Sequence, residues 1–490
     1  MRPPLTVPRD RLLSVLCRIG PCSPAALQDA LGVPRSTLLR LLDEQAAALV
    51  SAGAGRRRRL AARRGLRGDV SGIPVHRVDA SGRVHAAGTL HLIEPQGGWW
   101  PLDAAVWPVP EAARDGWWSG LPLPLQDLRV QGYLGRQFAR AHGPLLGLPP
   151  DPGDWHDADH LWALAQAGAD LPGDLIVGEA ALQRWLTSPP ESAADGEDPG
   201  PAYAALADQA VAGGLAGSSA AGEFPKFTAR RRLAGAATPE VIVKFSGADD
   251  SPAVRRWADL LRCEHHALRT LAEASDLPVP RTRVLVHGGR TFLESERFDR
   301  HADRGRSPVI SLAALDAEVL GRATSHWPTL AQGLAQALAG PGWLSADDVG
   351  RIRRLHLYGR LIDNSDMHTG NLAFVPDAGR LRLAPVYDML PMRHAPLAGG
   401  EVRPIASPQP WLPRPDEHDD WLQAVDWARR FWQTVALDAA LHDTLRTLAE
   451  GHLAWLGHVQ SDAAPDTHAH SRERPSATFP NPGSGFPTVG

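Results

Sequence analysis

The 490-residue chain is predicted to be an α+β protein of two or three domains, and three observations support this. Three short segments with helical periodicity, followed by an arginine run, lie within the first 70 residues. Residues 73–93 and 241–297 contain alternating or β-branched segments typical of strands, and the region from about 300 to 458 is mostly helical in pattern. A chain of this length also exceeds what one hydrophobic core usually organises.

The composition argues against a membrane protein, a secreted protein and a disulfide-rich protein. No apolar stretch approaches the roughly 20 residues that a membrane helix needs, and the first residues do not form a signal peptide. Cys17, Cys22 and Cys263 form no Cys-x-x-Cys pair and are too few for a disulfide framework or structural zinc. We therefore expect a soluble, cytoplasmic protein.

Charge is divided unevenly along the chain. Residues 1–70 contain thirteen arginines against five acidic residues, a net charge of +8. Since the whole chain has a formal net charge of -4, the other 420 residues carry -12. This asymmetry predicts a basic nucleic-acid-binding module joined to an acidic body.

The first three predicted helices are short. Residues 9–20 place leucines on one face, and Ser23 is a suitable N-cap for a second helix that ends at Gly32. A longer third helix is predicted over residues 35–50, with its inward-facing residues being Leu38, Leu39, Leu41 and Leu42.

A basic hairpin is predicted after the third helix, from Gly53 to Leu60. Three helices followed by a basic hairpin is the order of a winged helix-turn-helix, which binds duplex DNA through its third helix and its wing. The residues predicted to contact DNA are Arg35, Ser36, Thr37, Arg40, Arg56, Arg57, Arg58 and Arg59. The alternative is a small helical bundle whose arginines are merely solvated.

Further elements follow in order. A hairpin is predicted around residues 79–82, and the tryptophans of 99–118 are interpreted as core residues. Residues 121–186 are expected to mix loop and helix, 187–202 to form a flexible insertion, and the segment after 203 to form a Gly/Ser loop. A strand at 241–246, a helix at 253–274 and strands near 282–297 come next. The tail 461–490 is expected to be disordered, and this favours solvation over metal binding for His468 and His470.

Two residue types are scarce enough to be informative. Lysine occurs only at Lys226 and Lys244, although the chain has 51 basic residues. Asparagine occurs only at Asn364, Asn371 and Asn481. A coding bias against these two residue types is the simplest cause. We therefore expect each remaining lysine and asparagine to occupy a position whose role arginine or aspartate could not fulfil.

One segment has the spacing that ATP-dependent phosphoryl transfer requires. Asp366 is followed five residues later by Asn371, and Asp388 comes seventeen residues after that. The first carboxylate can accept the proton of an attacking hydroxyl, while Asn371 and Asp388 supply oxygen ligands for Mg²⁺. An ordinary turn would also explain the first aspartate and asparagine taken alone.

The upstream partners strengthen this interpretation. Lys244 lies inside a β-branched strand, where a charge is costly unless an anion meets it. Glu264, twenty residues later in an amphipathic helix, is placed to hold Lys244 toward the ATP phosphates. Lys226 follows a loop of small residues containing Ser218 and Ser219, whose backbone N–H groups could approach phosphate oxygens.

Together these motifs resemble the HipA-type toxin serine/threonine kinases. The matching motifs are Gly-Glu-Phe-Pro-Lys at 222–226, Val-Ile-Val-Lys at 241–244, Glu-Arg-Phe-Asp-Arg at 296–300, Asp366-x-His368-x-x-Asn371 and Tyr387-Asp388-x-x-Pro391. The resemblance implies a two-lobed, phosphatidylinositol-kinase-like fold, and the winged-helix start is similar to the YjjJ-like branch. Two positions depart from the family pattern, Phe224 and Gly370.

The resemblance also implies functional roles. Asp366 and His368 would be catalytic, Asn371 and Asp388 would bind Mg²⁺, and Ser219 would be autophosphorylated to switch the kinase off. ATP would be bound by Ser218, Ser219, Lys226, Lys244, Glu264, Glu296 and Phe298. The implied partners are a protein substrate, such as an aminoacyl-tRNA synthetase, and an antitoxin.

We therefore expect five regions: a winged helix at 1–70, a β-rich subdomain with an insertion at 71–202, a kinase N-lobe at 203–300, a helical C-lobe at 301–460 and the tail. Two other functions remain open. The chain could be a DNA-binding regulator whose kinase-like body only senses nucleotide, or a small-molecule phosphotransferase of related fold.

Overall fold

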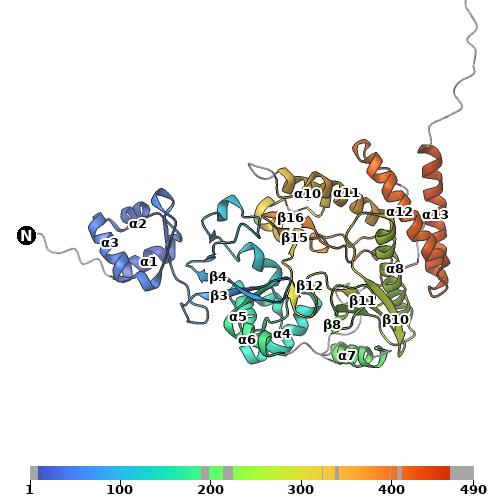
Figure 1. The fold of residues 1–490 in the computed structure, drawn as a ribbon, viewed down its shortest axis with the longest axis horizontal. Coiled ribbons are helices and arrows are strands. Elements are labelled where there is room, and N and C mark those ends of the chain that lie inside the picture. Colours follow the sequence, from blue (N-terminus) through green and yellow to red (C-terminus); the bar gives the residue numbers. More distant parts are fainter. Residues whose placement is uncertain are drawn as a thin grey trace, which may run out of the picture.

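The computed structural model describes residues 9–188, 198–212, 224–322, 324–336, 342–397, 399–404 and 411–463. A small helical unit lies at one end, next to a β-rich middle region and a larger body with a sheet-containing part and a helical part (Figure 1). Among the described residues, no helix is long and apolar enough to cross a membrane. Cys17, Cys22 and Cys263 are free thiols.

The N-terminal unit has its own hydrophobic core. Helices α1 (Arg9–Ile19), α2 (Pro24–Leu31) and α3 (Arg35–Glu44) precede an antiparallel pair, β1 (Leu49–Ala52) and β2 (Arg59–Ala62). The Ser23 side chain accepts a hydrogen bond from the Ala26 N–H, and α2 ends at Gly32 with φ +66°. Leucines from all three helices and both strands form a cluster separate from the rest of the protein's core.

The third helix differs from the prediction in two respects. It ends at Glu44 rather than at residue 50, because residues 49–52 pair with β2 and bury Leu49 and Val50. Leu39, predicted to face inward, is 50% exposed, whereas its three neighbouring leucines are buried. Leu39 shares the outer face of α3 with Arg35, Ser36 and Arg40.

The middle region is built on a five-stranded sheet with the order β6-β5-β4-β3-β7. Strands β3 (Ile73–Val78) and β4 (Val84–Leu92) form the predicted hairpin. The other elements are β5 (Gly98–Trp99), β6 (Trp117–Trp118), β7 (Leu175–Val177), α4 (Gly132–Leu146), α5 (Asp157–Ala167) and α6 (Glu179–Thr187). Trp100, Trp107, Trp117 and Trp118 are buried, as their interpretation as core residues predicted.

A four-stranded antiparallel sheet carries the site. Its order is β10 (Thr282–His287), β11 (Arg290–Glu296), β9 (Glu240–Phe245) and β8 (Lys226–Arg230). Helix α8 (Pro252–Ala274) packs on the sheet and runs alongside it in Figure 1, and Tyr203 of α7 (Gly200–Ala212) packs against Phe227, Phe245 and Phe292. Strand β8 was not predicted, and α7 replaces part of the expected insertion and Gly/Ser loop.

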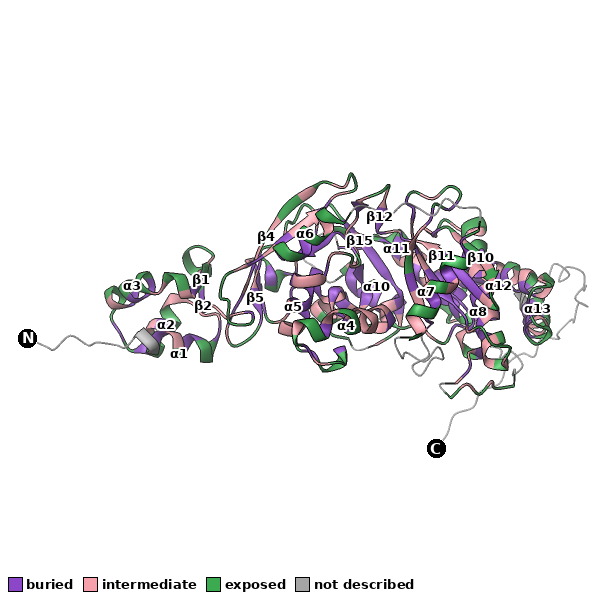
Figure 2. Ribbon diagram, turned by 90° about the horizontal axis from the view of Figure 1, so that it is seen from below, coloured by how far each residue is buried: buried purple, intermediate pink, exposed green. Residues whose placement is uncertain are grey.

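The remaining part is mainly helical, and its helices contribute many residues to the hydrophobic core cluster that it shares with α8 and the middle region. Its helices are α9 (Leu312–Leu315), α10 (Trp327–Gln336), α11 (Ala346–Leu361), α12 (His418–Leu437) and α13 (Asp443–Ala463). Short strands lie between them: β12 (Arg300–His301), β13 (Gly305–Arg306), β14 (Ile310–Ser311), β15 (Ala373–Asp377) and β16 (Arg380–Leu383). Buried residues concentrate in α8, α11 and the nearby strands (Figure 2). The last helix reaches Ala463, so the first residues of the expected tail are helical.

Candidate functional site

Lys244 is held by an ion pair inside the four-stranded sheet. Alternation along β9 turns Val243 and Phe245 toward the core beneath α7 and leaves Lys244 on the opposite face, toward α8. Lys244 Nζ lies 2.7 Å from both carboxylate oxygens of Glu264, which α8 brings to this face. The structure therefore brings together the lysine and the glutamate that the sequence analysis paired.

Asp388 completes this charged group. Its carboxylate forms an ion pair with Lys244, and Asp388 has a left-handed backbone conformation with φ +52°. Burial disfavours the charged form of Lys244, but the two carboxylates outweigh it and raise the pKa of Lys244 above its ordinary value. Burial likewise opposes ionisation of Asp388, yet Lys244 and Lys226 lower the pKa of its carboxyl. Both groups are therefore charged at neutral pH.

These residues line a cavity of about 330 Å³ between the sheet and the helical part. Six of the predicted site residues line it: Lys226, Lys244, Glu264, Glu296, Phe298 and Asp388. The apolar side of the cavity includes Ile242, Val309 and Tyr387, and Tyr387 stacks on Phe298 with ring centroids 6.0 Å apart. A volume in this range, mostly apolar with convergent charges, suits a small-molecule ligand such as a nucleotide.

The segment after α11 is fixed by Asn364, a residue to which the sequence analysis gave no role. Asn364 Nδ2 donates to the Asp388 carbonyl at 3.1 Å, and Asn364 Oδ1 accepts from the Asp366 N–H at 3.0 Å. One buried amide therefore connects the backbone of Asp366, the predicted base, with that of Asp388, a predicted metal ligand. The scarcity of asparagine in the chain was the one signal in the sequence that pointed to it.

Asp366 and His368 line a different cavity, of about 350 Å³. Gly370, two residues further along, lines the cavity of Lys244, so the loop lies between the two spaces. The loop is held by the Tyr387 hydroxyl, which donates to the Gly370 carbonyl at 2.7 Å, and by Trp327 Nε1, which donates to the His368 carbonyl at 3.1 Å. His368 Nδ1 accepts from the Gly370 N–H at 3.0 Å, so this ring caps a short turn.

Asn371 lines neither of these two cavities. Its Nδ2 donates to the Asp366 carbonyl at 2.7 Å, which leaves Oδ1 as the atom that could ligate a cation. Asn371 Oδ1 and the Asp388 carboxylate are both oxygen donors, the ligand type that Mg²⁺ prefers. The donor types of the predicted metal residues therefore fit this ion.

Glu296 and Phe298 lie at the end of β11, where the chain leaves the sheet. Glu296 Oε1 accepts from the Ala237 N–H at 2.5 Å, so its carboxylate holds the loop between β8 and β9. Phe298 lies in the turn that follows and contributes its ring to the cavity wall.

An ion-pair network of three buried residues, Arg297, Asp299 and Arg300, with the exposed Asp170 anchors this turn to the middle region. Arg297 Nη1 and Arg300 Nη2 both contact Asp170, at 3.0 and 2.7 Å, and Asp299 accepts from the Gly173 N–H at 2.9 Å. Burial opposes ionisation of Asp299, but Arg297 and Arg300 lower the pKa of its carboxyl to about 2. The sequence analysis quoted this motif but assigned no role to Arg297, Asp299 or Arg300.

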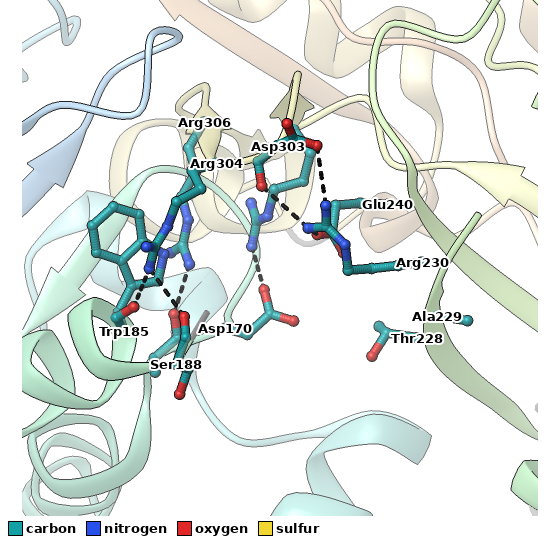
Figure 3. A pocket seen from close by; sticks show the side chains of 12 residues that line it. Asp170, Trp185, Ser188, Thr228, Ala229, Arg230, Glu240, Asp303, Arg304 and Arg306 are labelled. Atoms are coloured by element: carbon teal, nitrogen blue, oxygen red, sulfur yellow. Dashed lines mark hydrogen bonds and ion pairs between the residues drawn. The ribbon is translucent and has the colours of Figure 1, made fainter. Parts of the chain in front are cut away.

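The same network borders an arginine-rich cavity of about 330 Å³, shown in Figure 3. Arg304 lies 4.3 Å from the Trp185 ring centroid, and Arg230 is paired with Glu240 and Asp303. Burial and the nearby Arg300 lower the pKa of Arg306 to about 9. These partners give the cavity a structural role at the junction of the middle region and the sheet.

The other predicted residues lie elsewhere. Ser218 and Ser219 are outside the described residues. On the N-terminal unit, Arg35, Ser36, Arg40, Arg56, Arg57 and Arg59 are exposed, and Thr37 and Arg58 are half-buried. Arg40 is paired with Glu44 at 3.3 Å, and Arg58 Nε donates to Ser51 at 3.1 Å within the hairpin. Arg57 of the hairpin also lies 3.8 Å from Asp115 of the middle region.

Comparison with known proteins gives matches over most of the chain. Residues 69–186 match the YjjJ-like toxin middle domain, and residues 218–450 match the HipA-like C-terminal domain. Toxin YjjJ of Escherichia coli (strain K12) is 34% identical over 431 residues, which are 88% of this chain and 94% of the relative.

Two solved structures are also similar. A chain of the Shewanella oneidensis MR-1 complex of HipA, HipB and operator DNA has a TM-score of 0.46 at 14% identity, covering 79% of this chain and 97% of its own. The Helicobacter pylori proinflammatory kinase CtkA has a TM-score of 0.33 at 12% identity, covering 49% of this chain and 92% of its own. The sequence matches carry the assignment: the chain belongs to the HipA-like toxin family, in its YjjJ-like branch.

Proposed function

We propose that this protein is an ATP- and Mg²⁺-dependent serine/threonine protein kinase. The observation that carries the proposal is Lys244, which is paired with Glu264 and Asp388 at a nucleotide-sized cavity. A buried lysine between two carboxylates is the arrangement that kinases use to hold the α- and β-phosphates beside a metal-binding aspartate.

Each residue has a distinct part in the proposed reaction. Lys244, oriented by Glu264, would contact phosphate oxygens, and Phe298 and Tyr387 would cover the base. Asp366, in the adjoining cavity, would orient the acceptor hydroxyl and take its proton as the oxygen attacks the γ-phosphorus. The bond to the β-phosphate oxygen then breaks, and ADP leaves. Asn371 and Asp388 would hold Mg²⁺, which supplies charge neutralisation of the phosphates.

Transfer of ³²P from γ-labelled ATP tests the proposal. The full chain should label itself or a protein in a cell lysate, and folded Asp388→Asn protein should not. Label on a small metabolite instead would favour a small-molecule phosphotransferase. An aminoacyl-tRNA synthetase is the first candidate substrate that we would test, on the basis of family membership.

A second function is supported by the N-terminal unit. We propose that it binds duplex DNA, because three helices precede a basic β1–β2 hairpin, and Arg35, Arg40, Arg56, Arg57 and Arg59 are exposed. An antitoxin is a further partner that we would test, on the basis of family membership. If DNA binding is retained and no phosphoryl transfer occurs, the alternative of a nucleotide-sensing regulator is favoured.

A further inference from the structure

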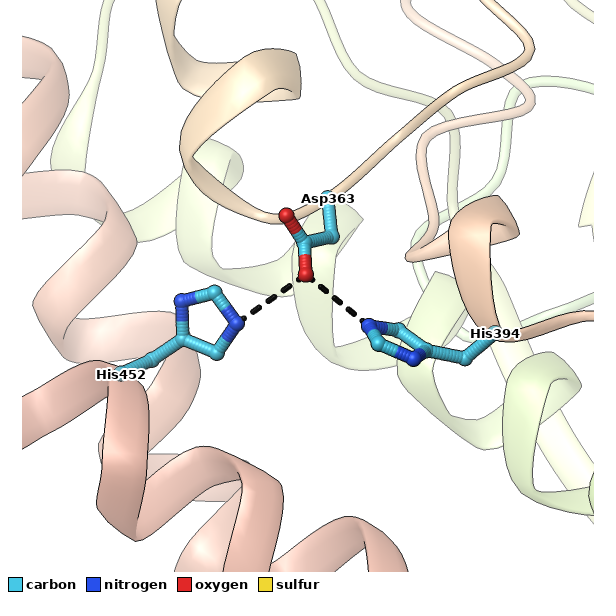
Figure 4. A group of neighbouring side chains, drawn as sticks. All are labelled: Asp363, His394 and His452. Carbon is cyan, nitrogen blue, oxygen red and sulfur yellow. Dashed lines mark hydrogen bonds and ion pairs between the residues drawn. The ribbon is translucent and has the colours of Figure 1, made fainter. Parts of the chain in front are cut away.

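Three buried polar side chains form a cluster, and none of them lines either of the two cavities near Lys244 and Asp366. Asp363 follows α11, His394 follows the Asp388 segment, and His452 belongs to α13 (Figure 4). Their side chains are 11%, 5% and 2% exposed. The proposed kinase reaction uses none of them.

All three side chains converge on one point. His394 Nε2 lies 2.9 Å from Asp363 Oδ2, and His452 Nε2 lies 3.1 Å from the same oxygen. One potential ligand atom from each residue lies within 4.8 Å of the other two. The second oxygen, Asp363 Oδ1, faces Arg393 at 3.8 Å, so only Oδ2 is directed at the two rings.

We propose that Asp363, His394 and His452 bind a zinc ion or a chemically similar divalent transition metal. Two imidazoles and a carboxylate are a donor set that suits zinc, whereas Mg²⁺ takes oxygen ligands. Zinc bonds of about 2.0–2.1 Å in a tetrahedron separate the ligand atoms by about 3.3 Å. The observed separations of 2.9 and 3.1 Å would need to widen by only a few tenths of an ångström.

The ring of His452 is held in place by its neighbours. Its ring stacks on Trp432 with centroids 4.2 Å apart and an interplanar angle of 8°. Within the described residues, His452 Nδ1 has no hydrogen-bond partner, so the hydrogen bond of this ring is the one between Nε2 and Asp363 Oδ2. The nitrogen that would bind an ion is therefore Nε2, the atom that faces Asp363.

The ion would have three ligands from the protein. Over the ranges that the structure describes, no fourth His, Cys, Asp or Glu joins the group, so a water molecule would take the fourth position. The ligands come from the segments that carry Asp366 and Asp388 and from the last helix. A bound ion would therefore fix both segments to α13, and this inference does not depend on the proposed kinase activity.

Metal titration of the full chain, prepared without a histidine tag and stripped with chelator, tests the proposal. Zn²⁺ or Co²⁺ is added in the presence of excess Mg²⁺, which occupies oxygen-ligand sites. We expect about one ion per chain, an intense tetrahedral Co²⁺ absorption band, and a rise in melting temperature. Asp363→Asn and His452→Gln should each weaken binding by about 100-fold or more.

A matched control is provided by the tail. The double variant His468→Ala/His470→Ala removes two histidines but should retain binding. Circular dichroism without metal shows whether the Asp363→Asn and His452→Gln proteins fold. If neither variant folds, X-ray absorption of the wild-type zinc complex tests the ligand set instead. We expect two imidazoles and at least one oxygen ligand around the ion.

The proposal would be overturned by no tight ion in the wild type, by unchanged binding in folded Asp363→Asn, or by loss of binding in the tail variant. A ligand set other than two imidazoles with oxygen would do the same. In each case the three residues form a hydrogen-bonded triad only.

Discussion

Asn364 Nδ2 donates a hydrogen bond of 3.1 Å to the backbone carbonyl of Asp388. The two residues flank a stretch that contains Asp366, Asn371 and strands β15 and β16, so this bond closes the loop that carries the proposed chemistry. Because Asp388 has a positive φ, its conformation depends on such contacts.

The first prediction concerns this amide. Asn364→Asp keeps an acceptor for the Asp366 N–H but turns a carboxylate oxygen toward the Asp388 carbonyl. We expect kcat/KM for phosphoryl transfer to fall roughly 10- to 100-fold, since a lost buried hydrogen bond costs about 1–3 kcal/mol. Asn481→Asp, the same change in the tail, is the control. Equal turnover in both variants would show that the amide does not position the site.

The second prediction separates activity from stability at Lys244. Lys244→Met should abolish phosphoryl transfer and also destabilise the fold by about 3–5 kcal/mol, because it leaves buried carboxylates unpaired. Adding Glu264→Gln should recover part of the stability without recovering transfer. Denaturant unfolding and ³²P transfer are measured on both proteins, and an active double variant would contradict the assignment of Lys244.

The third prediction concerns DNA. Binding of the full chain to duplex DNA should weaken steeply with salt, and replacing Arg56, Arg57, Arg58 and Arg59 with alanine should reduce both the affinity and the salt slope. A control variant changes the net charge equally by replacing four arginines of the body: Arg255, Arg269, Arg380 and Arg382. Equal losses in the two variants, measured by fluorescence anisotropy, would point to non-specific attraction instead.

The fourth prediction concerns the pH dependence of stability that Asp174 causes. Asp174 is 1% exposed, and within the described residues its two carboxylate oxygens have no hydrogen-bond partner. Burial raises the pKa of Asp174 to about 7, while the ordinary value is 3.8. The folded protein therefore keeps this proton when the unfolded chain has lost it. Stability falls as pH rises from about 4 to 7, by at most about 4 kcal/mol.

Asp174→Asn should accordingly raise the melting temperature at pH 8 and change it little at pH 4.5. Asp299→Asn is the opposite case, because the pKa of Asp299 is lowered to about 2. Its ionised form stabilises the fold at both pH values, so this variant should melt earlier at both. Parallel pH profiles for the two variants would rule out the assigned environments.

The fifth prediction concerns Ser219, which lies outside the described residues. Phosphate on Ser219 would add a charge of about -1.5 to -2 and compete for the groups that bind ATP phosphates. Incubation with Mg-ATP should yield phosphoserine at 219 and a progressive loss of transfer, and Ser219→Ala should stay active. Mass spectrometry distinguishes Ser219 from Ser218. Phosphorylation of Ser219 without loss of activity would end the self-inhibition model.

Local rules accounted for much of the fold. The capped helix after Ser23, the hairpin around residues 79–82 and the long helix that begins after Ser251 each follow from signals within a few residues. The pairing of Lys244 with Glu264 was also predictable, because a charge inside an apolar strand needs a partner. Strand β8 and helix α7 were missed because the loop-forming glycines next to them dominated the local pattern.

Contacts between distant segments could not be predicted from the sequence. Asp363 and His452 are separated by 89 residues, and Asp170 and Arg297 by 127, so no periodicity or spacing relates them. The exposure of Leu39 shows the same limit, since only the packing of α3 decides which leucines face the core.

The anchoring of Arg297, Asp299 and Arg300 to residues 170–173 has a mechanical consequence. In two-lobed enzymes, the connection between the lobes is commonly where bending occurs when a ligand is enclosed. Here Arg297, Asp299 and Arg300 are buried and make several ion pairs, two of them to the exposed Asp170, and bending at this turn would separate these pairs. We therefore expect any opening of the cavity that Lys244 lines to involve other parts of the chain, with the turn at residues 297–300 staying attached to the middle region.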